Sequence, residues 1–174
     1  MKRETAERAQ AFPAAGGEPV ALKLEEFFPY RLNICAVLMS QALSRIYSER
    51  YRIGVPEWRV LATLGQHRVM TGKQIGVVST MHKTKVSRAV AQLEKRKLLA
   101  RCPNRDDLRE AFLSLTSAGE AIYKEAAPLA VEFARQLLEV VDPADRPALD
   151  RALTRLTEHS QQLTADLAKR PVRR

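Results

Sequence analysis

The amino-acid sequence predicts a mainly helical fold of the α+β class, with long helices at both ends of one small domain. The first observation is the spacing of apolar residues, which recur every three to four positions through most of 24–168, as in amphipathic helices. The second is a change of period, because apolar and polar side chains alternate over 110–115 as in a strand, and 99–103 can pair with them. A chain of 174 residues is long enough to bury one core.

The N-terminal segment 1–22 is predicted to be a disordered arm. It is polar and rich in Ala, Gly and Pro, and Gly16-Gly17 between two prolines argues against regular structure. A first helix follows over 24–52, and its apolar residues spread beyond one face. Because so broad an apolar surface needs packing on two sides, we assign this helix to a dimerisation region.

A proline and a capping box mark the next two helices. Pro56 suits the first position of a helix, because the N–H that proline lacks would have no partner there. Thr71 can cap a short helix, and Gln74 can reach back to Thr71. We expect the short helix to end near Val78, with Ile75 and Val78 turned inward.

The stretch 81–99 carries the main functional signal. Its apolar residues at helical spacing predict a buried face made of Val86, Ala89, Val90 and Leu93. The opposite face gathers cations and small polar side chains in the first two turns, where a helix in the DNA major groove meets phosphates and base edges. Joined to the short helix by the turn at 79–80, it forms a helix-turn-helix. The alternative is that this face is only exposed to solvent, because charge patterning alone is a weak signal of nucleic-acid binding.

A basic hairpin follows the helix-turn-helix. The two strand-like runs are joined by the polar loop 104–109, which holds two arginines. A helix-turn-helix with such a hairpin is a winged helix, so we predict a DNA-binding domain over 55–115. The wing is expected to lie against the DNA backbone or the minor groove.

Two long helices complete the chain over 116–168. Thr116 can cap the first, which is expected to reach about Val141 and to bend at Pro128. Asp142-Pro143 is predicted to start the second. The leucines of the second helix are spaced as in a coiled-coil seam, which predicts a homodimer: Leu149, Leu153, Leu156, Leu163 and Leu167. Residues 169–174 are predicted to form a basic tail.

The charge distribution predicts a polyanionic partner. The net charge is +9, and nine cationic residues face three acidic ones between Lys83 and Arg109. Such a local excess of positive charge is typical of nucleic-acid binding. A scaffold protein would explain the terminal helices but not these clustered cations.

Other function classes find no support in the sequence. There is no apolar run long enough to cross a bilayer and no signal-like segment at the N-terminus, so we expect a cytoplasmic protein with no membrane partner. Cys35 and Cys102 lie far apart, and the three histidines are scattered, which argues against a disulfide, a metal site or a cofactor. No nucleophile with a base and no carboxylate pair stands at a recognisable spacing, so we do not expect an enzyme.

The chain resembles the MarR (multiple antibiotic resistance regulator) family of winged helix-turn-helix transcription factors over roughly 25–168. Four motifs in this order carry the resemblance: Pro56-Glu-Trp-Arg-Val-Leu61, Lys83-Thr-Lys-Val-Ser-Arg88, Asp107-Leu-Arg109 and Leu115-Thr-Ser-Ala-Gly119. The family implies a homodimer that binds a pseudo-palindromic operator, as a repressor that a small ligand releases.

The resemblance also implies which residues contact DNA. They are Lys83, Thr84, Lys85, Ser87 and Arg88 on the recognition helix and Arg109 in the wing, with Arg105 as a further candidate. Asp107 would pair with Arg109 and hold the wing tip, whereas Ser87 could instead bond to its own helix backbone. Three departures from the family are His82, where an acidic cap is common, Leu108, at a wing position that is often basic, and Lys97, where a glycine is usual.

The family's ligand pocket lies between the winged domain and the dimer helices. Here the aromatic walls and the cation that an aromatic carboxylate or its CoA thioester needs could come from Tyr30, Arg45, Tyr47, Arg52, Trp58 and His67. Trp58 and Tyr47 could equally be plain core residues. A second hypothesis is a repressor that senses organic hydroperoxide through Cys35, although a cysteine on an apolar stripe is usually inert.

Overall fold

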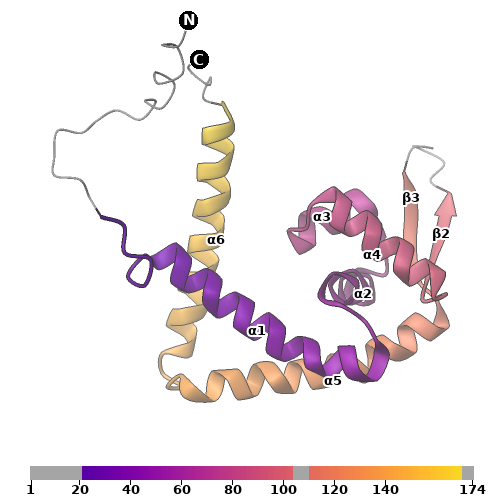
Figure 1. The fold of residues 1–174 in the computed structure, drawn as a ribbon, viewed down its shortest axis with the longest axis horizontal. Helices are drawn as coiled ribbons and strands as arrows, with labels where there is room; N and C mark the ends of the chain where they lie inside the picture. The colour runs from indigo at the N-terminus through magenta and orange to yellow at the C-terminus, as the bar shows by residue number, and fades with distance from the viewer. Residues whose placement is uncertain (1–20, 104–109, 170–174) are drawn as a thin grey trace, which may run out of the picture. The chain divides into compact units, whose positions relative to one another are not determined.

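The computed structural model describes residues 21–103 and 110–169 (Figure 1). It confirms the predicted fold class, since helices make up most of these residues and a small antiparallel sheet is the other element. The chain divides between Gln41 and Ala42 into two compact units, which we describe separately. The predicted arm lies largely, and the basic tail almost wholly, outside the described residues.

Helix α1 (Phe28–Tyr51) begins in the first unit and ends in the second. It starts four residues later than predicted, because the preceding residues form a turn in which the Phe27 amide donates to the Lys23 carbonyl at 3.0 Å. Tyr47 is the buried residue of the helix.

Three helices of the second unit enclose its core: α2 (Val55–His67), α3 (Gly72–Ser79) and α4 (Lys83–Lys95). The side chains of Leu61, Ile75 and Leu93 are completely buried, and each contributes about 1.5–3 kcal/mol through the hydrophobic effect. The predicted face of α4 packs on this core, since Val86, Ala89, Val90 and Leu93 are all buried.

The capping box at the start of α3 is confirmed. The Gln74 amide donates to Thr71 Oγ1 at 3.3 Å, and the Thr71 amide donates to Gln74 Oε1 at 2.8 Å. The inward orientation predicted for Val78 is wrong, because this residue is 51% exposed. The helix has only two turns, Ile75 occupies its buried face, and the chain leaves the helix after Ser79.

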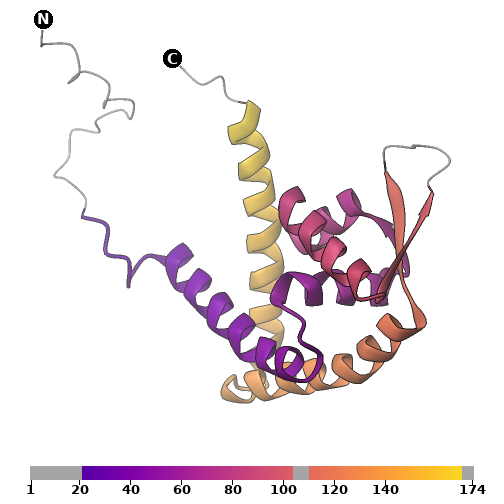
Figure 2. The same cartoon turned by 45° about the vertical axis from the view of Figure 1, so that its right-hand side comes forward.

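A three-stranded antiparallel sheet flanks the helices, with the strand order β1-β3-β2 (Figure 2). Strand β2 (Leu99–Pro103) has the predicted bounds, and strand β3 (Ala111–Leu115) begins one residue later than the predicted run 110–115. Leu99 pairs with Leu115. Strand β1 (Val69–Thr71) is not among the predicted elements. It is too short to show a period, and only its pairing with β3, with Val69 opposite Ser114, makes it a strand.

Helix α5 (Ser117–Leu137) begins at the predicted cap, where the Gly119 amide donates to Thr116 Oγ1 at 3.2 Å. It runs through Pro128 and ends before a short 3-10 helix, Leu138–Val140. Helical structure therefore continues almost to the predicted end near Val141, but its last three residues form a 3-10 helix and not an α-helix.

Helix α6 (Arg146–Lys169) starts later than predicted. The Asp142 carboxylate accepts from the amide of Ala144 at 2.9 Å, and the Asp142 carbonyl accepts from Asp145. This local turn satisfies the groups that would otherwise begin a helix at Pro143, so the prediction of a start at 142–143 is wrong.

Candidate nucleic-acid interface

Helix α4 presents the predicted polar face to solvent. Five side chains that the sequence assigns to DNA contact are exposed on it: Lys83, Thr84, Lys85, Ser87 and Arg88. Within 21–103 and 110–169, none of the cations among them forms an ion pair. Among the described residues, these cations therefore need not break an ion pair before they neutralise a polyanion.

The first turn of α4 is capped by His82, as the departure from the family suggested. Its Nδ1 accepts from the Thr84 amide at 3.3 Å. This bond requires that Nδ1 carry no proton, because only the unprotonated ring nitrogen is an acceptor. The cap adds no negative charge where the helix faces its proposed anionic partner.

The other end of α4 closes through Lys97. This residue has φ 56°, in the left-handed region that favours glycine. The Leu98 amide donates to the Leu93 carbonyl at 2.9 Å, and the Lys97 amide donates to Glu94 at 2.8 Å. Such bonds end a helix with its last carbonyls satisfied, and they direct the chain into β2.

Glu94 is the acidic side chain on this part of the chain, and it is already paired. Arg101 on β2 donates from Nε to Glu94 Oε1 at 2.5 Å and from Nη2 to Oε2 at 2.8 Å. The hydrogen bonds to Glu94 raise the pKa of Arg101 above its ordinary value. The pair links β2 to α4 and cancels a negative charge that would repel phosphate.

A hollow of about 780 Å³ lies between α3, α4 and the two longer strands. Its lining residues include the cations Lys73, Lys83 and Arg101, the carboxylate Glu110, and apolar residues such as Met81 and Val86. Helix α4 therefore borders a concave surface with an excess of positive charge, which favours a negatively charged ligand.

The predicted wing contacts lie outside the described residues. Arg105, Asp107 and Arg109 all belong to 104–109. The DNA contact predicted for the two arginines and the role predicted for Asp107 therefore stay predictions.

The six residues predicted to bind a ligand have different surroundings. Tyr47 and Trp58 stack with ring centroids 5.0 Å apart and an angle of 16°, and both are buried, which favours the core interpretation. Burial is also the main cause that raises the pKa of Tyr47. The other four, Tyr30, Arg45, Arg52 and His67, are exposed. Tyr30 belongs to the first unit and the others to the second.

Neither cysteine forms a disulfide, and both are exposed. The expectation that Cys35 is an inert core residue is therefore not met within one chain. No group of three metal-binding side chains gathers among the described residues. Helices long and apolar enough to span a bilayer are likewise absent from the part of the chain that the structure describes.

The MarR family model matches residues 53–111, which hold α2, α3, α4 and most of the sheet. A solved MarR/EmrR family transcriptional regulator from Acinetobacter sp. ADP1 is 26% identical with a TM-score of 0.74, and the match covers 81% of this chain and 99% of that one. The search of the curated proteins found no match.

Two further solved structures share the fold. NadR, solved in complex with 4-hydroxyphenylacetate, is 21% identical with a TM-score of 0.65, over 79% of this chain and 96% of NadR. BpsR from Bordetella bronchiseptica, whose DNA binding is regulated by 6-hydroxynicotinic acid, is 20% identical with a TM-score of 0.62, over 73% and 98% of the two chains. The predicted resemblance is confirmed.

Proposed function

We propose that this chain acts as a MarR family regulator, which binds an operator in double-stranded DNA through α4 and represses transcription there. The observation that carries the proposal is the exposed face of α4, whose cations have no partner among the described residues. Lys83 and Lys85 would neutralise phosphates, while Arg88, one turn further along, would reach base edges in the major groove.

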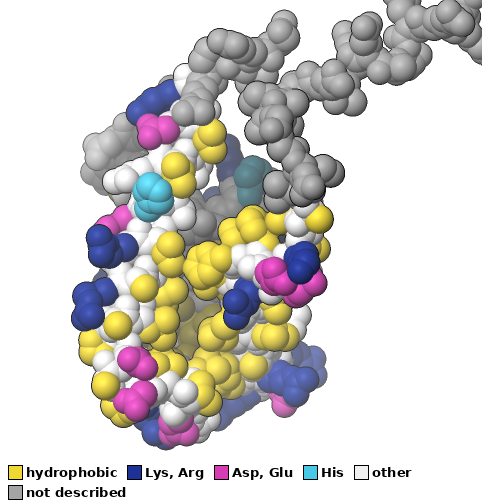
Figure 3. All heavy atoms as spheres, turned by 90° about the vertical axis from the view of Figure 1, so that its left-hand side faces the viewer, with side chains coloured by type: hydrophobic (Ala, Val, Ile, Leu, Met, Phe, Trp, Pro, Cys, Tyr) yellow, Lys and Arg dark blue, Asp and Glu magenta, His cyan; other side chains and the backbone are white. Residues whose placement is uncertain are grey.

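The proposed regulator is a homodimer. Five leucines recur at intervals of three, four and seven along α6, and each is between 38% and 64% exposed: Leu149, Leu153, Leu156, Leu163 and Leu167. Figure 3 shows how widely hydrophobic side chains are exposed on one face of the molecule. Such a stripe is typical of a helix that pairs with another, so the terminal helices over 24–52 and 116–168 would join two copies. The domain 55–115 of each copy would then bind one operator half-site.

A small aromatic carboxylate or its CoA thioester is the proposed effector. NadR and BpsR, which share the fold, are described with 4-hydroxyphenylacetate and 6-hydroxynicotinic acid. Both compounds are small aromatic acids, which is the ligand class that the sequence suggested. Because effector and DNA would favour different arrangements of the dimer, each would weaken the binding of the other by the same factor.

The experiment is a binding titration with a duplex selected from a random pool by the wild-type dimer. Arg88→Ala should abolish specific binding and leave the dimer intact. Arg151→Ala on α6 is the matched control, because it removes the same charge from an exposed helical position away from α4. Equal affinities of the two variants would contradict the proposal.

The exposed thiol of Cys35 favours a second candidate, a repressor that responds to organic hydroperoxide. The test is the release of DNA by cumene hydroperoxide from the wild type and from Cys35→Ser. A response lost only in the variant would support redox sensing. An unchanged response would exclude Cys35 as the sensor.

A further inference from the structure

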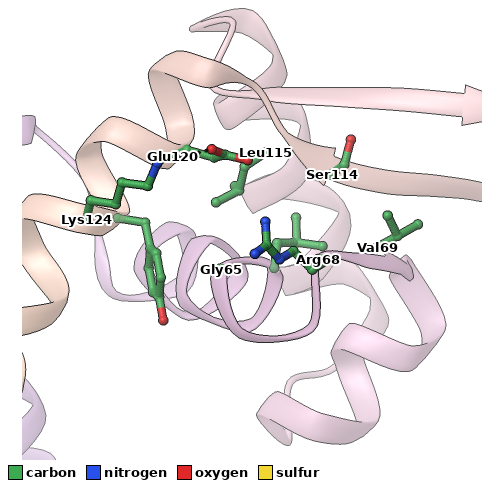
Figure 4. A pocket seen from close by; sticks show the side chains of 9 residues that line it. Gly65, Arg68, Val69, Ser114, Leu115, Glu120 and Lys124 are labelled. Carbon is green, nitrogen blue, oxygen red and sulfur yellow. Dashed lines mark ion pairs between the residues drawn. The ribbon is translucent and has the colours of Figure 1, made fainter.

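A second cavity lies on the side of the sheet where the end of α2, strands β1 and β3, and the start of α5 meet (Figure 4). Its volume is about 330 Å³, near the lower limit of the range for small-molecule sites. Its walls are mainly apolar and come from Leu64, Val69, Leu115 and Tyr123. None of its residues belongs to the α4 surface or to the six residues that the sequence suggested for an effector.

The charged side chains that line the cavity differ in whether they form an ion pair. Lys124 pairs with Glu120, with Nζ 3.5 Å from Oε2. Arg68 forms no side-chain hydrogen bond and no ion pair with any described residue. Figure 4 shows the Arg68 side chain turned back over Gly65, toward the side of the cavity where Glu120 and Leu115 lie. The guanidinium is therefore an available cation beside an apolar wall.

The backbone holds Arg68 in an unusual conformation. Its φ is 68° and its ψ is −64°, in the region of the γ-turn that side-chain-bearing residues rarely adopt. The Arg68 amide donates to the Leu64 carbonyl at 2.8 Å, which ends α2 and turns the chain into β1. Strained residues of this kind are concentrated at ligand sites, which motivates a functional hypothesis for Arg68.

The opposite wall is fixed by close packing. A Cβ on Gly65 would lie 2.5 Å from the ring of Tyr123, so only glycine lets this ring lie against the backbone of α2. The ring and the α2 backbone thus form one apolar wall of fixed position, next to the guanidinium of Arg68.

We propose that this cavity binds a small monocarboxylate with an apolar body, with Arg68 holding the carboxylate through two parallel hydrogen bonds. The apolar body would lie against Leu64, Leu115 and Tyr123. The charges of Arg68, Lys124 and Glu120 sum to +1, which suits one negative charge. A phosphate dianion fits less well, because Glu120 would repel its second charge. Guanidinium and carboxylate are matched in shape as well as in charge.

The test measures binding of benzoate to the full-length chain by calorimetry, without DNA. Benzamide, which has nearly the same shape and no charge, is the ligand control. Arg68→Gln should weaken benzoate about tenfold or more, because hydrogen bonds to charged groups are worth about 1.5–3 kcal/mol. Arg59→Gln, at an exposed position of α2, is the matched protein control and should leave the affinity unchanged.

Arg68→Lys should give an intermediate affinity, because it keeps the charge and loses the paired geometry. The proposal is overturned if Arg68→Gln binds benzoate as the wild type does, if benzamide binds equally well, or if inorganic phosphate binds more tightly than benzoate. Thermal unfolding confirms that each variant is folded. The measurement involves no DNA, so a negative result would leave the proposed function intact. Benzoate bound at another site would have the same affinity in the wild type and in Arg68→Gln.

Discussion

The guanidinium of Arg96, directly after α4, donates a hydrogen bond of 2.7 Å from Nη2 to the backbone carbonyl of Tyr51 at the end of α1. Its Nη1 also donates to the carbonyl of Arg52 at 2.9 Å. The hydroxyl of Tyr51 donates in turn to Glu125 on α5, also at 2.9 Å. The position of α4 is thereby tied, through the end of α1, to α5, the long helix of the proposed dimerisation region.

Arg96→Ala should lower the free energy of unfolding by about 1 kcal/mol, because two carbonyls lose a charged donor at an exposed site. Lys95→Ala removes the same charge one residue earlier and should change stability by less than about 0.5 kcal/mol. Urea denaturation of both variants without DNA measures the difference. If both are as stable as the wild type, the link does not hold the helix.

Lys97→Gly should stabilise the chain by about 1 kcal/mol. At φ 56° the Lys97 side chain crowds its own backbone, and glycine does not. Lys95→Gly is the opposite control, since Lys95 is the last residue of α4 and glycine there costs roughly 0.5–1 kcal/mol. Opposite shifts of the melting temperature would support the assigned end of the helix, and a loss of stability in both would contradict it.

Gly119→Ala should destabilise the chain by about 1–3 kcal/mol, although alanine is normally the better residue in a helix. A Cβ at this position would lie 2.1 Å from the carbonyl oxygen of Leu98, which is backbone and cannot turn aside. Ala121→Gly in the same helix loses only helix propensity, about 1 kcal/mol. Denaturant titration compares them. A gain in stability for Gly119→Ala would show that α5 and the start of β2 are not in close contact.

The sequence predicted the elements whose pattern is local. Spacing and residue type predicted the buried face of α4, the capping box of Thr71 and Gln74, and the two strands β2 and β3, and all three features are observed. Strand β1 was missed because three residues show no period and only β3 makes them a strand. The late start of α6 was missed because Asp142 bonds within its own turn.

The polar face of α4 could be predicted from the sequence, whereas the cavity beside Arg68 could not. The cations of α4 were found because a helix places residues of one face together, whatever surrounds them. The cavity beside Arg68 was not predicted. Gly65, Arg68 and Tyr123 come from two elements far apart in sequence, and only the packing of α2 against α5 brings them together.

The salt dependence of DNA affinity tests the central claim most directly, namely that the cations of α4 bind phosphate. The measurement is fluorescence anisotropy with one duplex, for the wild type and for Lys83→Ala/Lys85→Ala, over a range of salt concentrations. If both lysines of each copy contact phosphates, the slope of log K against log salt should fall in magnitude by about 0.9 for each lost contact, so by about 3.6 in a dimer. Equal slopes for the two proteins would remove this face from the DNA and contradict the account.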